Sequence, residues 1–465
     1  MSSTIFVLLL AGLAMSVMAD YTGKVLLISM DGFRYDYLDM VDTPNFDDFA
    51  RQGVKLPYMN NSFTTLTFPN HYTIVTGLWE ESHGIIGNHM YDPMFNASFG
   101  MGTTESRWWD EGEPLWVTAK KKGLKTGTYY WPGSEVEIRG FRPDIWFKYS
   151  DKTPYKERVD TVIDWFKNKD VRMATLYYPE PDHTGHGYGP DSQQVKDKVK
   201  YMDGILGYLM EKLKDNDLEN TVNVIVTSDH GMVDVDNINK VVDITDHVNM
   251  TLIDSVPMYG PVMHILPKDG QDDNIMADLE GVSNITAYKK DDIPEHFHYR
   301  NNRRIMPIVI IADEGWQLTT KKDKVARSTL KATHGYDNNL RRLTLLTQSS
   351  QFLLIHFQNK TKKAKSTLKA THGYDNALMS MKPIFLARGP NFKTNFTSDP
   401  IKNVDIYPLV CKLLKIEPAP NNGSLTRVNA FIQDTPPVSG SPINAPVLLF
   451  ECLLVFTVVA NHLLH

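Results

Sequence analysis

The sequence contains little cysteine, no excess of basic charge and no uninterrupted hydrophobic run long enough to span a bilayer. Only two cysteines, Cys411 and Cys452, occur in 465 residues, which excludes a small fold held together by disulfides. The formal net charge is −6 and the pI is near 6.2, whereas a surface that coats nucleic acid is basic. With 42% hydrophobic residues, the chain is expected to fold around a large core.

The amino terminus carries a hydrophobic segment that is typical of a secretory signal. Residues 5–15 are too short to cross a bilayer, and Ala19 offers a small residue at a cleavage point. This pattern predicts a signal peptide over residues 1–19. The chain also contains seven N-x-S/T sequons, as expected for a glycoprotein of the secretory pathway. They are Asn60, Asn96, Asn249, Asn284, Asn359, Asn395 and Asn422.

The carboxyl terminus is also hydrophobic. Residues 446–465 are interrupted by Glu451, and no Lys or Arg follows the apolar part. A transmembrane anchor usually carries basic residues on its cytoplasmic side, so the pattern favours a removed GPI signal over a single-pass anchor. We expect residues 20–435 to form one functional domain on the extracellular face. Residues 436–465 are expected to be a linker followed by the anchor or GPI signal.

Hydrophobic runs of strand length alternate with helical patterns along the chain. The runs Lys24–Met30 and Val222–Ser228 each end at an aspartate, and apolar residues recur at helical spacing over Val195–Leu213. Further runs of strand length are Val171–Tyr178, Arg304–Ala312 and Pro383–Arg388. This alternation predicts an α/β fold with a mostly parallel central sheet and helices on both faces. In such sheets functional side chains gather beyond the carboxyl ends of the strands.

One segment is repeated. Ser328–Asn338 reads STLKATHGYDN, and Ser366–Asn376 repeats it unchanged at an offset of 38 residues. A single pair does not make a solenoid. We interpret the pair as a duplicated exon or a gene-model error, with His372 as the functional copy and His334 as the surplus one.

Seven residues, spread over more than 300 positions, have the chemistry of a two-metal site. They are Asp31, Thr67, Asp182, His186, Asp229, His230 and His372. We expect each at a strand end or in a loop. Carboxylates together with imidazoles suit Zn²⁺ better than Mg²⁺, and two metals about 4 Å apart can hold the attacking and leaving oxygens of a phosphoryl transfer. On spacing alone, Asp182 and His186 fit a glycine-rich surface loop better than a ligand pair.

Motifs in a fixed order along residues 22–430 resemble the ectonucleotide pyrophosphatase/phosphodiesterase family, which belongs to the alkaline-phosphatase-like superfamily. The resemblance is to the short, membrane-anchored type and excludes the repeated segment. The motifs are SMDGFR (29–34), TLTFPNHY (65–72), YWPGSEVEI (130–138), EPDHTGHGYGP (180–190), SDHGM (228–232), ADEGW (312–316) and HGYDN (372–376). The resemblance implies an alkaline-phosphatase-like α/β fold, two Zn²⁺ and a nucleotide pyrophosphatase/phosphodiesterase activity.

The resemblance also implies a role for each site residue. Thr67 is then the nucleophile, and Asn88 with the backbone N–H of Phe68 stabilises the non-bridging phosphate oxygens. Attack by Thr67 gives a nucleotidyl-threonine, which water hydrolyses to release a nucleoside 5′-monophosphate. One Zn²⁺ is assigned to Asp31, Thr67, Asp229 and His230. The other is assigned to Asp182, His186 and His372.

Aromatic residues point to a nucleotide substrate. Phe68, Trp131 and Tyr149 match positions that flank the base in the nucleotide-cleaving branch of the family, although a large aromatic such as Trp131 is often a core residue. Aromatic faces stack on any base, so they favour nucleotides without selecting one. The expected substrates are dinucleoside polyphosphates, ATP or NAD-like dinucleotides.

Two alternatives remain open. The same metals serve a phosphodiesterase of choline lipids in another branch of the family. The repeat leaves a second possibility, a binding ectodomain with impaired catalysis, because about 38 extra residues beside His372 could displace a ligand and displacements of about 1 Å matter to catalysis.

Overall fold

The computed structural model describes residues 23–320 and 368–433. The chain divides into two compact units, Met1–Ile432 and Gln433–His465, and all described residues except Gln433 belong to the first. The predicted signal peptide, the predicted anchor and the first copy of the repeat lie outside the described ranges. Within those ranges no helix combines the length and hydrophobicity needed to cross a membrane.

The central sheet is mostly parallel, as the sequence predicts. Within the described residues it has seven strands, and the five from β8 to β6 run parallel, whereas β17 pairs antiparallel with both β8 and β2. The strands are, in spatial order, β2 (Val54–Lys55), β17 (Phe385–Arg388), β8 (Val222–Thr227), β1 (Lys24–Met30), β7 (Met173–Tyr178), β5 (Thr126–Tyr129) and β6 (Ile145–Trp146).

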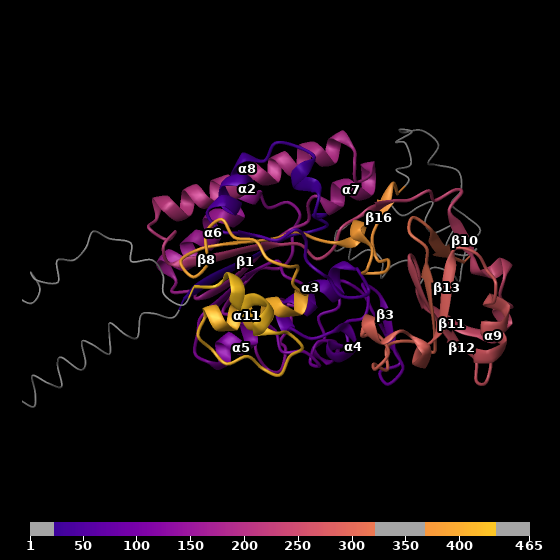
Figure 1. The fold of residues 1–465 in the computed structure, drawn as a ribbon. Helices are drawn as coiled ribbons and strands as arrows, with labels where there is room; N and C mark the ends of the chain where they lie inside the picture. Colours follow the sequence, from indigo (N-terminus) through magenta and orange to yellow (C-terminus); the bar gives the residue numbers. More distant parts are fainter. Residues whose placement is uncertain (1–22, 321–367, 434–465) are drawn as a thin grey trace, which may run out of the picture. The chain divides into compact units, whose positions relative to one another are not determined.

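Helices cover both faces of this sheet (Figure 1). Along β1, Leu26, Ile28 and Met30 pack into one hydrophobic cluster, whereas Val25 and Leu27 pack into another on the opposite face, as the alternation of side chains along a strand requires. The first cluster includes residues of α2 (Pro44–Arg51), α6 (Tyr155–Asn168) and α8 (Gln193–Asp215). The second includes residues of α3 (Thr67–Thr76), α5 (Leu115–Lys121) and α11 (Ile406–Leu413).

A second, smaller sheet differs from the expectation. The run Arg304–Ala312 does form a strand, β14 (Ile308–Ala312), but this strand belongs to a four-stranded antiparallel sheet rather than the central one. A buried hydrophobic run indicates a strand without indicating its partner. The strands are, in spatial order, β11 (Ile253–Met258), β12 (Val262–Pro267), β14 and β13 (Ile285–Lys289), and the helix α9 (Asp272–Leu279) lies between β12 and β13 in the chain.

Short elements complete the described fold. They are β3 (Met90–Asp92), β4 (Ala97–Phe99), β9 (Val233–Asp234), β10 (Val241–Asp243), β15 (Gln317–Thr319), β16 (Ala370–Thr371), α4 (Glu80–His83), α7 (Asp182–Tyr188) and α12 (Leu425–Val428). β16 pairs with β9 and so brings the second copy of the repeat to the segment that follows β8.

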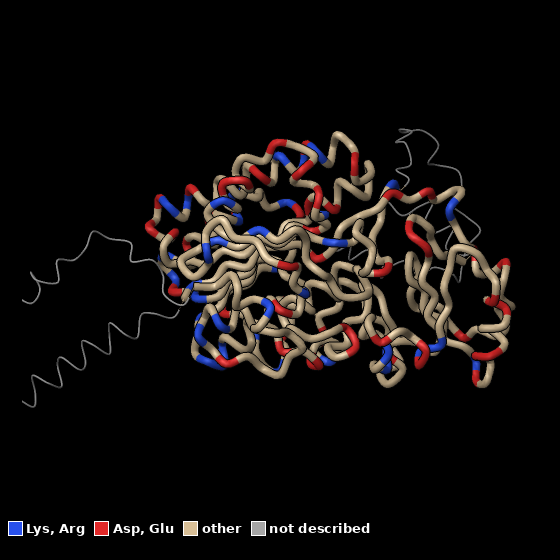
Figure 2. Tube along the Cα trace, in the orientation of Figure 1, with Lys and Arg blue, Asp and Glu red and all other residues tan. Residues whose placement is uncertain are grey.

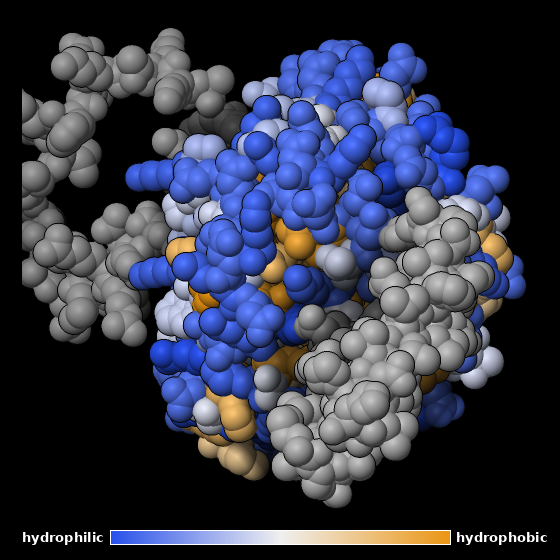
Figure 3. All heavy atoms as spheres, turned by 90° about the vertical axis from the view of Figure 1, so that its left-hand side faces the viewer, coloured by the Kyte–Doolittle hydropathy of each residue, from blue (hydrophilic) through white to orange (hydrophobic). Residues whose placement is uncertain are grey.

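Charge and hydropathy follow this layered arrangement. Lys, Arg, Asp and Glu are interspersed along the covering helices, whereas the central strands carry little charge (Figure 2). The face in Figure 3 is mostly hydrophilic, with small hydrophobic patches among its described residues. Hydrophobic side chains are gathered mainly in the core, as a parallel sheet covered on both faces requires.

Candidate active site

The predicted site residues meet beyond the carboxyl ends of the central strands. Asp31 directly follows β1, and Asp229 and His230 follow β8. The other predicted residues come from α7, from the first position of α3 and from the residue after β16. Thr67, Asp182 and His186 therefore lie on helices, not at strand ends or in loops as expected. The glycines of the α7 sequence suggested a loop, but one helical turn is what aligns Asp182 with His186.

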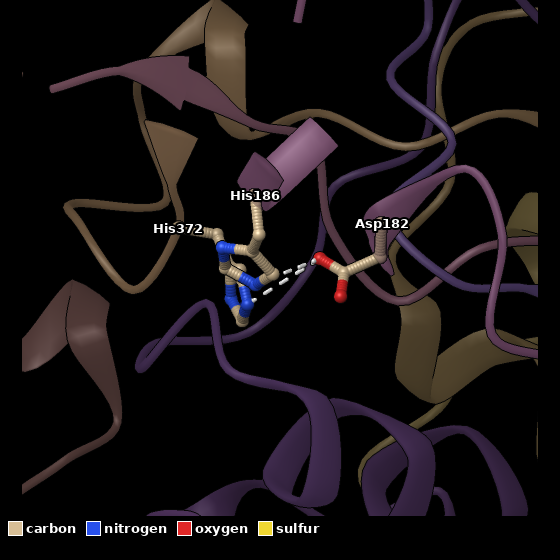
Figure 4. A group of neighbouring side chains, drawn as sticks. All are labelled: Asp182, His186 and His372. Atoms are coloured by element: carbon tan, nitrogen blue, oxygen red, sulfur yellow. Dashed lines mark ion pairs between the residues drawn. The ribbon is translucent and has the colours of Figure 1, made fainter. Parts of the chain in front are cut away.

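Asp182, His186 and His372 form one candidate ligand group (Figure 4). The Asp182 Oδ1 atom lies 3.3 Å from His186 Nε2 and 3.6 Å from His372 Nε2. All three residues are buried. The second copy of the repeat therefore supplies a histidine to the pocket, while His334 lies outside the described residues.

Asp31, Asp229, His230 and Thr67 lie next to this group. His230 Nε2 is 3.0 Å from Asp229 Oδ2 and 3.4 Å from Asp31 Oδ1, and it is 3.4 Å from the hydroxyl of Thr67. The ring of His230 stacks on the ring of His372 with centroids 3.5 Å apart. The structure thus brings all seven predicted ligand residues into one pocket.

The histidines of the pocket are oriented in the same way. In each one Nδ1 bonds a main-chain carbonyl, so that Nε2 faces the pocket. His186 bonds the carbonyl of Ala370 at 2.8 Å, His230 that of Gly231 at 2.8 Å and His372 that of Thr65 at 2.9 Å. A partner on one ring nitrogen fixes the tautomer and leaves the lone pair of the other nitrogen for a metal.

The carboxylates next to β1 and β8 are also held on one side, because hydrogen bonds fix one oxygen of each. Asp31 Oδ2 accepts a hydrogen bond from the hydroxyl of Tyr177 at 2.6 Å, and Asp229 Oδ1 accepts one from Gly32 N at 3.1 Å and one from Ser228 Oγ at 3.2 Å. The other oxygens, Asp31 Oδ1 and Asp229 Oδ2, are buried and face imidazole nitrogens. His230 Nε2 lies 3.4 Å from the first and 3.0 Å from the second, and His71 Nδ1 lies 3.3 Å from the second. Buried carboxylate oxygens are costly unless a cation or a donor satisfies them, so this donor set fits bound cations.

The electrostatics of the pocket point the same way. Burial and the neighbouring carboxylates of Asp229 and Asp182 raise the pKa of Asp31 well above its ordinary value. Against the effect of burial, Asp229 raises the pKa of His230. The carboxylates therefore repel one another and attract positive charge, and two divalent cations would satisfy both tendencies.

Thr67 begins the buried helix α3. The backbone N–H of the next residue, Phe68, donates to Asn88 Oδ1 at 2.9 Å, which places Asn88 beside the start of this helix. The first N–H groups of a helix and its dipole favour negative charge. A phosphate oxygen held here would be close to Thr67, to the amide of Asn88 and to the start of the helix.

Sequence reasoning missed two residues that support the pocket. Tyr177 orients Asp31, as described above. His71 lies within 4.8 Å of the oxygens of Asp31 and Asp229, but its Nδ1 bonds the carbonyl of Thr67 at 2.8 Å and its Nε2 bonds Ser29 Oγ at 2.8 Å. His71 Nδ1 also lies 3.3 Å from Asp229 Oδ2. With both ring nitrogens engaged, His71 supports the start of α3 and Asp229 rather than offering a lone pair. His71 stands inside the TFPNHY motif, which was the one available signal.

The three predicted base-flanking aromatics occupy different environments. Phe68 is 8% exposed and packs against Trp109 with centroids 6.1 Å apart. Trp131 is 2% exposed, and its indole N–H donates to the His71 carbonyl at 3.0 Å. Tyr149 is partly buried, with its ring 6.2 Å from the ring of Tyr177. Tyr149 thus lies near Tyr177, which bonds Asp31, and Phe68 adjoins Thr67 in the chain, whereas Trp131 packs against His71.

Comparison with known proteins agrees with this geometry. The family model described as "Type I phosphodiesterase / nucleotide pyrophosphatase" matches residues 25–337. Human ectonucleotide pyrophosphatase/phosphodiesterase family member 5 is 38% identical, covering 89% of this chain and 79% of that protein. The bis(5′-adenosyl)-triphosphatase of Xenopus laevis is 36% identical over 88% and 82%, and family member 7 of Mus musculus is 37% identical over 86% and 85%. These identities are too close to select one substrate.

Solved structures match most of the chain. Human family member 5 superposes with a TM-score of 0.77 at 37% identity, covering 88% of this chain and 100% of that one. An inactive threonine-to-alanine variant of the murine protein, in complex with AMP, gives a TM-score of 0.76 at 38% identity with the same coverage. The predictions of an α/β alkaline-phosphatase-like fold and of a nucleotide pyrophosphatase/phosphodiesterase enzyme are confirmed, and the chain belongs to the ectonucleotide pyrophosphatase/phosphodiesterase family.

Proposed function

We propose that this enzyme is an extracellular, zinc-dependent hydrolase that cleaves nucleotide pyrophosphate and phosphodiester bonds through a nucleotidyl-threonine intermediate. One observation carries the proposal: ligand atoms from seven side chains converge in one buried pocket, and the hydroxyl of Thr67 lies among them, 3.4 Å from His230 Nε2. A hydroxyl held among metal ligands is the arrangement that activates a weak nucleophile.

Two cations fit the donor set. Asp182, His186 and His372 would hold one, and Asp31, Asp229, His230 and Thr67 would hold the other. Carboxylates with imidazoles favour Zn²⁺. When bound, Zn²⁺ favours the alkoxide of Thr67 over its hydroxyl and offsets charge on the phosphate oxygens.

The residues of the chain account for two displacement steps. In the first, the Thr67 oxygen loses its proton and forms a bond to phosphorus. The bond from phosphorus to the leaving oxygen breaks, and that oxygen departs with the electron pair and takes up a proton. In the second, a water oxygen bonds to phosphorus, the bond to Thr67 breaks and Thr67 regains a proton. Asn88 and the start of α3 stabilise the charge that develops on the remaining phosphate oxygens.

The substrate is proposed from the pocket walls and from relatives. Phe68 adjoins Thr67 in the chain and Tyr149 lies near Tyr177, which bonds Asp31, so their rings are the proposed contacts for a base. The murine relative binds AMP, the expected product of cleavage, and the Xenopus relative is named for a dinucleoside triphosphate. Dinucleoside polyphosphates, ATP and NAD-like dinucleotides are therefore the proposed substrates, with a nucleoside 5′-monophosphate as product.

The proposed location is the outer face of the cell. The hydrophobic amino terminus, the seven sequons and the hydrophobic carboxyl terminus support passage through the secretory pathway and a GPI or single-pass anchor. Release of the chain from intact cells by a phosphatidylinositol-specific phospholipase would support the GPI form. Retention after that treatment, with a labelled ectodomain, would support the single-pass form.

The test of the activity compares four samples on p-nitrophenyl thymidine monophosphate. They are the native chain, Thr67→Ala, a zinc-chelated sample and Thr76→Ala, a matched control in the same helix whose hydroxyl donates to the Tyr72 carbonyl. The proposal expects turnover by the native chain and the control only, and a peptide containing Thr67 that carries a thymidine monophosphate group after acid quenching. Turnover of p-nitrophenyl phosphorylcholine in its place would favour the choline-lipid alternative. No turnover of either ester would favour the impaired ectodomain.

A further inference from the structure

Arg304 is a fully buried guanidinium that bonds to the loop before β3. It is 0% exposed, and it donates to the Gly84 carbonyl at 2.6 Å and to the Trp108 carbonyl at 3.0 Å. It also donates to the carboxylate of Asp92, itself 0% exposed, at 2.8 Å. A buried charge is tolerated only when its partners are complete and well placed, so these contacts fix the geometry of the loop.

The loop that Arg304 holds is the one that carries Asn88. Gly84 stands four residues before Asn88, and Asp92 stands four residues after it, so Arg304 fixes the loop on both sides of Asn88. A third contact comes from the same stretch of chain as Arg304, because the hydroxyl of the buried Tyr299 donates to the Ile86 carbonyl at 2.8 Å.

Gly84 shows how close the approach is. Its φ is +74°, and a Cβ at this position would lie 2.6 Å from Arg304 Nη1. Glycine is therefore required both by the backbone conformation and by the guanidinium. The glycine that ends α4 therefore leaves the space that the Arg304 guanidinium occupies.

The same guanidinium also bonds the segment whose next residue packs against Phe68. Trp108, whose carbonyl it binds, precedes Trp109, and the ring of Trp109 packs 6.1 Å from the ring of Phe68. The backbone N–H of Phe68 in turn donates to Asn88 Oδ1 at 2.9 Å. Arg304 thus contacts the segments on both sides of the Phe68–Asn88 pair.

We propose that Arg304, which arrives from the segment before β14 of the second sheet, is a positioning residue that sets Asn88 for its contact with the substrate phosphate. This gives the smaller sheet a part in the reaction, although it supplies none of the seven predicted ligands. The proposal rests on the proposed function, in which Asn88 stabilises the phosphate in the transition state.

A matched control stands next to Arg304 in the sequence. Arg303 pairs with Asp92 at 2.8 Å and with Glu111 at 2.7 Å, the same two carboxylates that Arg304 reaches. Among the described residues, the hydrogen bonds of Arg303 reach no main-chain carbonyl of the loop around Asn88. Arg303→Lys therefore perturbs the same charge cluster without releasing the loop.

The experiment measures kcat and KM of the zinc-loaded full chain as Arg304→Lys, Tyr299→Phe and Arg303→Lys, each alone and combined with Asn88→Ala. We expect Arg304→Lys to lower kcat by about tenfold, a part of the 10²–10³ that loss of an oxyanion donor costs, with little change in KM. Tyr299→Phe is expected to lower kcat less, and Arg303→Lys to leave it unchanged. In the Asn88→Ala background Arg304→Lys should have no further effect.

Two results would overturn the proposal. One is that Arg304→Lys lowers kcat by the same factor in the native chain and in the Asn88→Ala chain. The other is that Arg303→Lys lowers kcat as much as Arg304→Lys does. If Arg304→Lys does not fold, Tyr299→Phe, which removes one hydroxyl, decides by the same comparison.

Hydrogen exchange of residues 85–91 separates this proposal from the proposed function, because it needs no turnover. We expect faster exchange in Arg304→Lys and Tyr299→Phe than in Arg303→Lys. If the native chain has no activity but the loop exchanges faster in Arg304→Lys, the positioning role of Arg304 is retained and the proposed activity is rejected. If the native chain is active and the exchange of the loop is unchanged in Arg304→Lys, only the positioning role is rejected.

Discussion

Two regions beside helix α3 bury polar side chains, and they treat charge in opposite ways. The metal pocket buries carboxylates, and Asp31 Oδ1 and Asp229 Oδ2 face imidazole nitrogens there. The second region, which we call the α3 network, includes two residues of the helix and is held together by hydrogen bonds among its members. Its members are Ser62, Asn70, Thr73, Glu80, His83 and Asn403.

The α3 network contains two ionisable groups, and burial favours the neutral form of each. Burial raises the pKa of Glu80 well above its ordinary value and lowers the pKa of His83 to about 3. Glu80 Oε1 accepts from Ser62 at 3.2 Å, and His83 Nε2 bonds Thr73 at 2.9 Å. In the α3 network only Asn403 Oδ1, a neutral amide oxygen, is buried without a hydrogen bond among the described residues. A buried neutral network of this kind is structural, whereas buried carboxylates grouped with imidazoles mark a site for cations.

The largest expected effect is on activity, from a substitution in the pocket. Asp31→Asn should lower kcat/KM by more than about 100-fold, because even outer partners of metal ligands cost about 10–100-fold. The same variant should be more stable than the native chain when both are free of metal, since it removes one of three mutually repelling carboxylates. Steady-state kinetics and urea unfolding in chelator measure the two effects. A metal-free variant less stable than the native chain would contradict the repulsion.

The next effect is on stability, from the metal itself. Zinc at about 1,000 times its dissociation constant should stabilise the native chain by about 4 kcal/mol for each site. Thermal unfolding with and without zinc measures this shift. Asp31→Asn should lose a large part of it, whereas Glu80→Gln should keep all of it. An equal shift in all three chains would mean that zinc binds elsewhere.

A smaller effect is expected in the α3 network, and it depends on pH. The folded state holds a proton on Glu80 that the unfolded state releases above its ordinary pKa of 4.5. The stability from this proton is complete below the unfolded pKa and declines, by about 1.4 kcal/mol for each pH unit, until the folded pKa is reached. Glu80→Gln should therefore gain stability relative to the native chain as the pH rises above 4.5. Urea unfolding from pH 5 to 8 tests this, and parallel curves would contradict it.

The smallest effect is expected from the repeat. Deleting residues 334–371 leaves a single STLKATHGYDN and retains His372. Because His372 already lies in the pocket, kcat should be unchanged. A loss of activity on deletion would mean that the intervening segment contributes to the enzyme.

The sequence was informative about residues whose chemistry is local. Buried runs such as Lys24–Met30 and Val222–Ser228 predicted β1 and β8, and the aspartates that follow them are at the site because parallel strands end at one edge. The two copies of the repeat are identical, so the choice of His372 over His334 could not rest on the motif itself. The family match itself ends at residue 337, within the first copy, and only the three-dimensional structure places His372.

The supporting contacts could not be predicted in this way. Tyr177 reaches Asp31 across 146 residues, and Arg304 reaches Gly84 across 220. Such contacts depend on which segments the fold brings together. Hydropathy patterns do not contain that information. A tyrosine or an arginine in a sequence looks the same whether it packs in a core or orients a ligand.

The most direct test of the central claim is the metal content of the purified chain. Elemental analysis of the native protein should find two zinc ions per chain, falling to one in His186→Ala, while Glu80→Gln keeps two. Zinc in equal amounts in the native chain and in His186→Ala, or none in an active native chain, would contradict the assignment of the pocket.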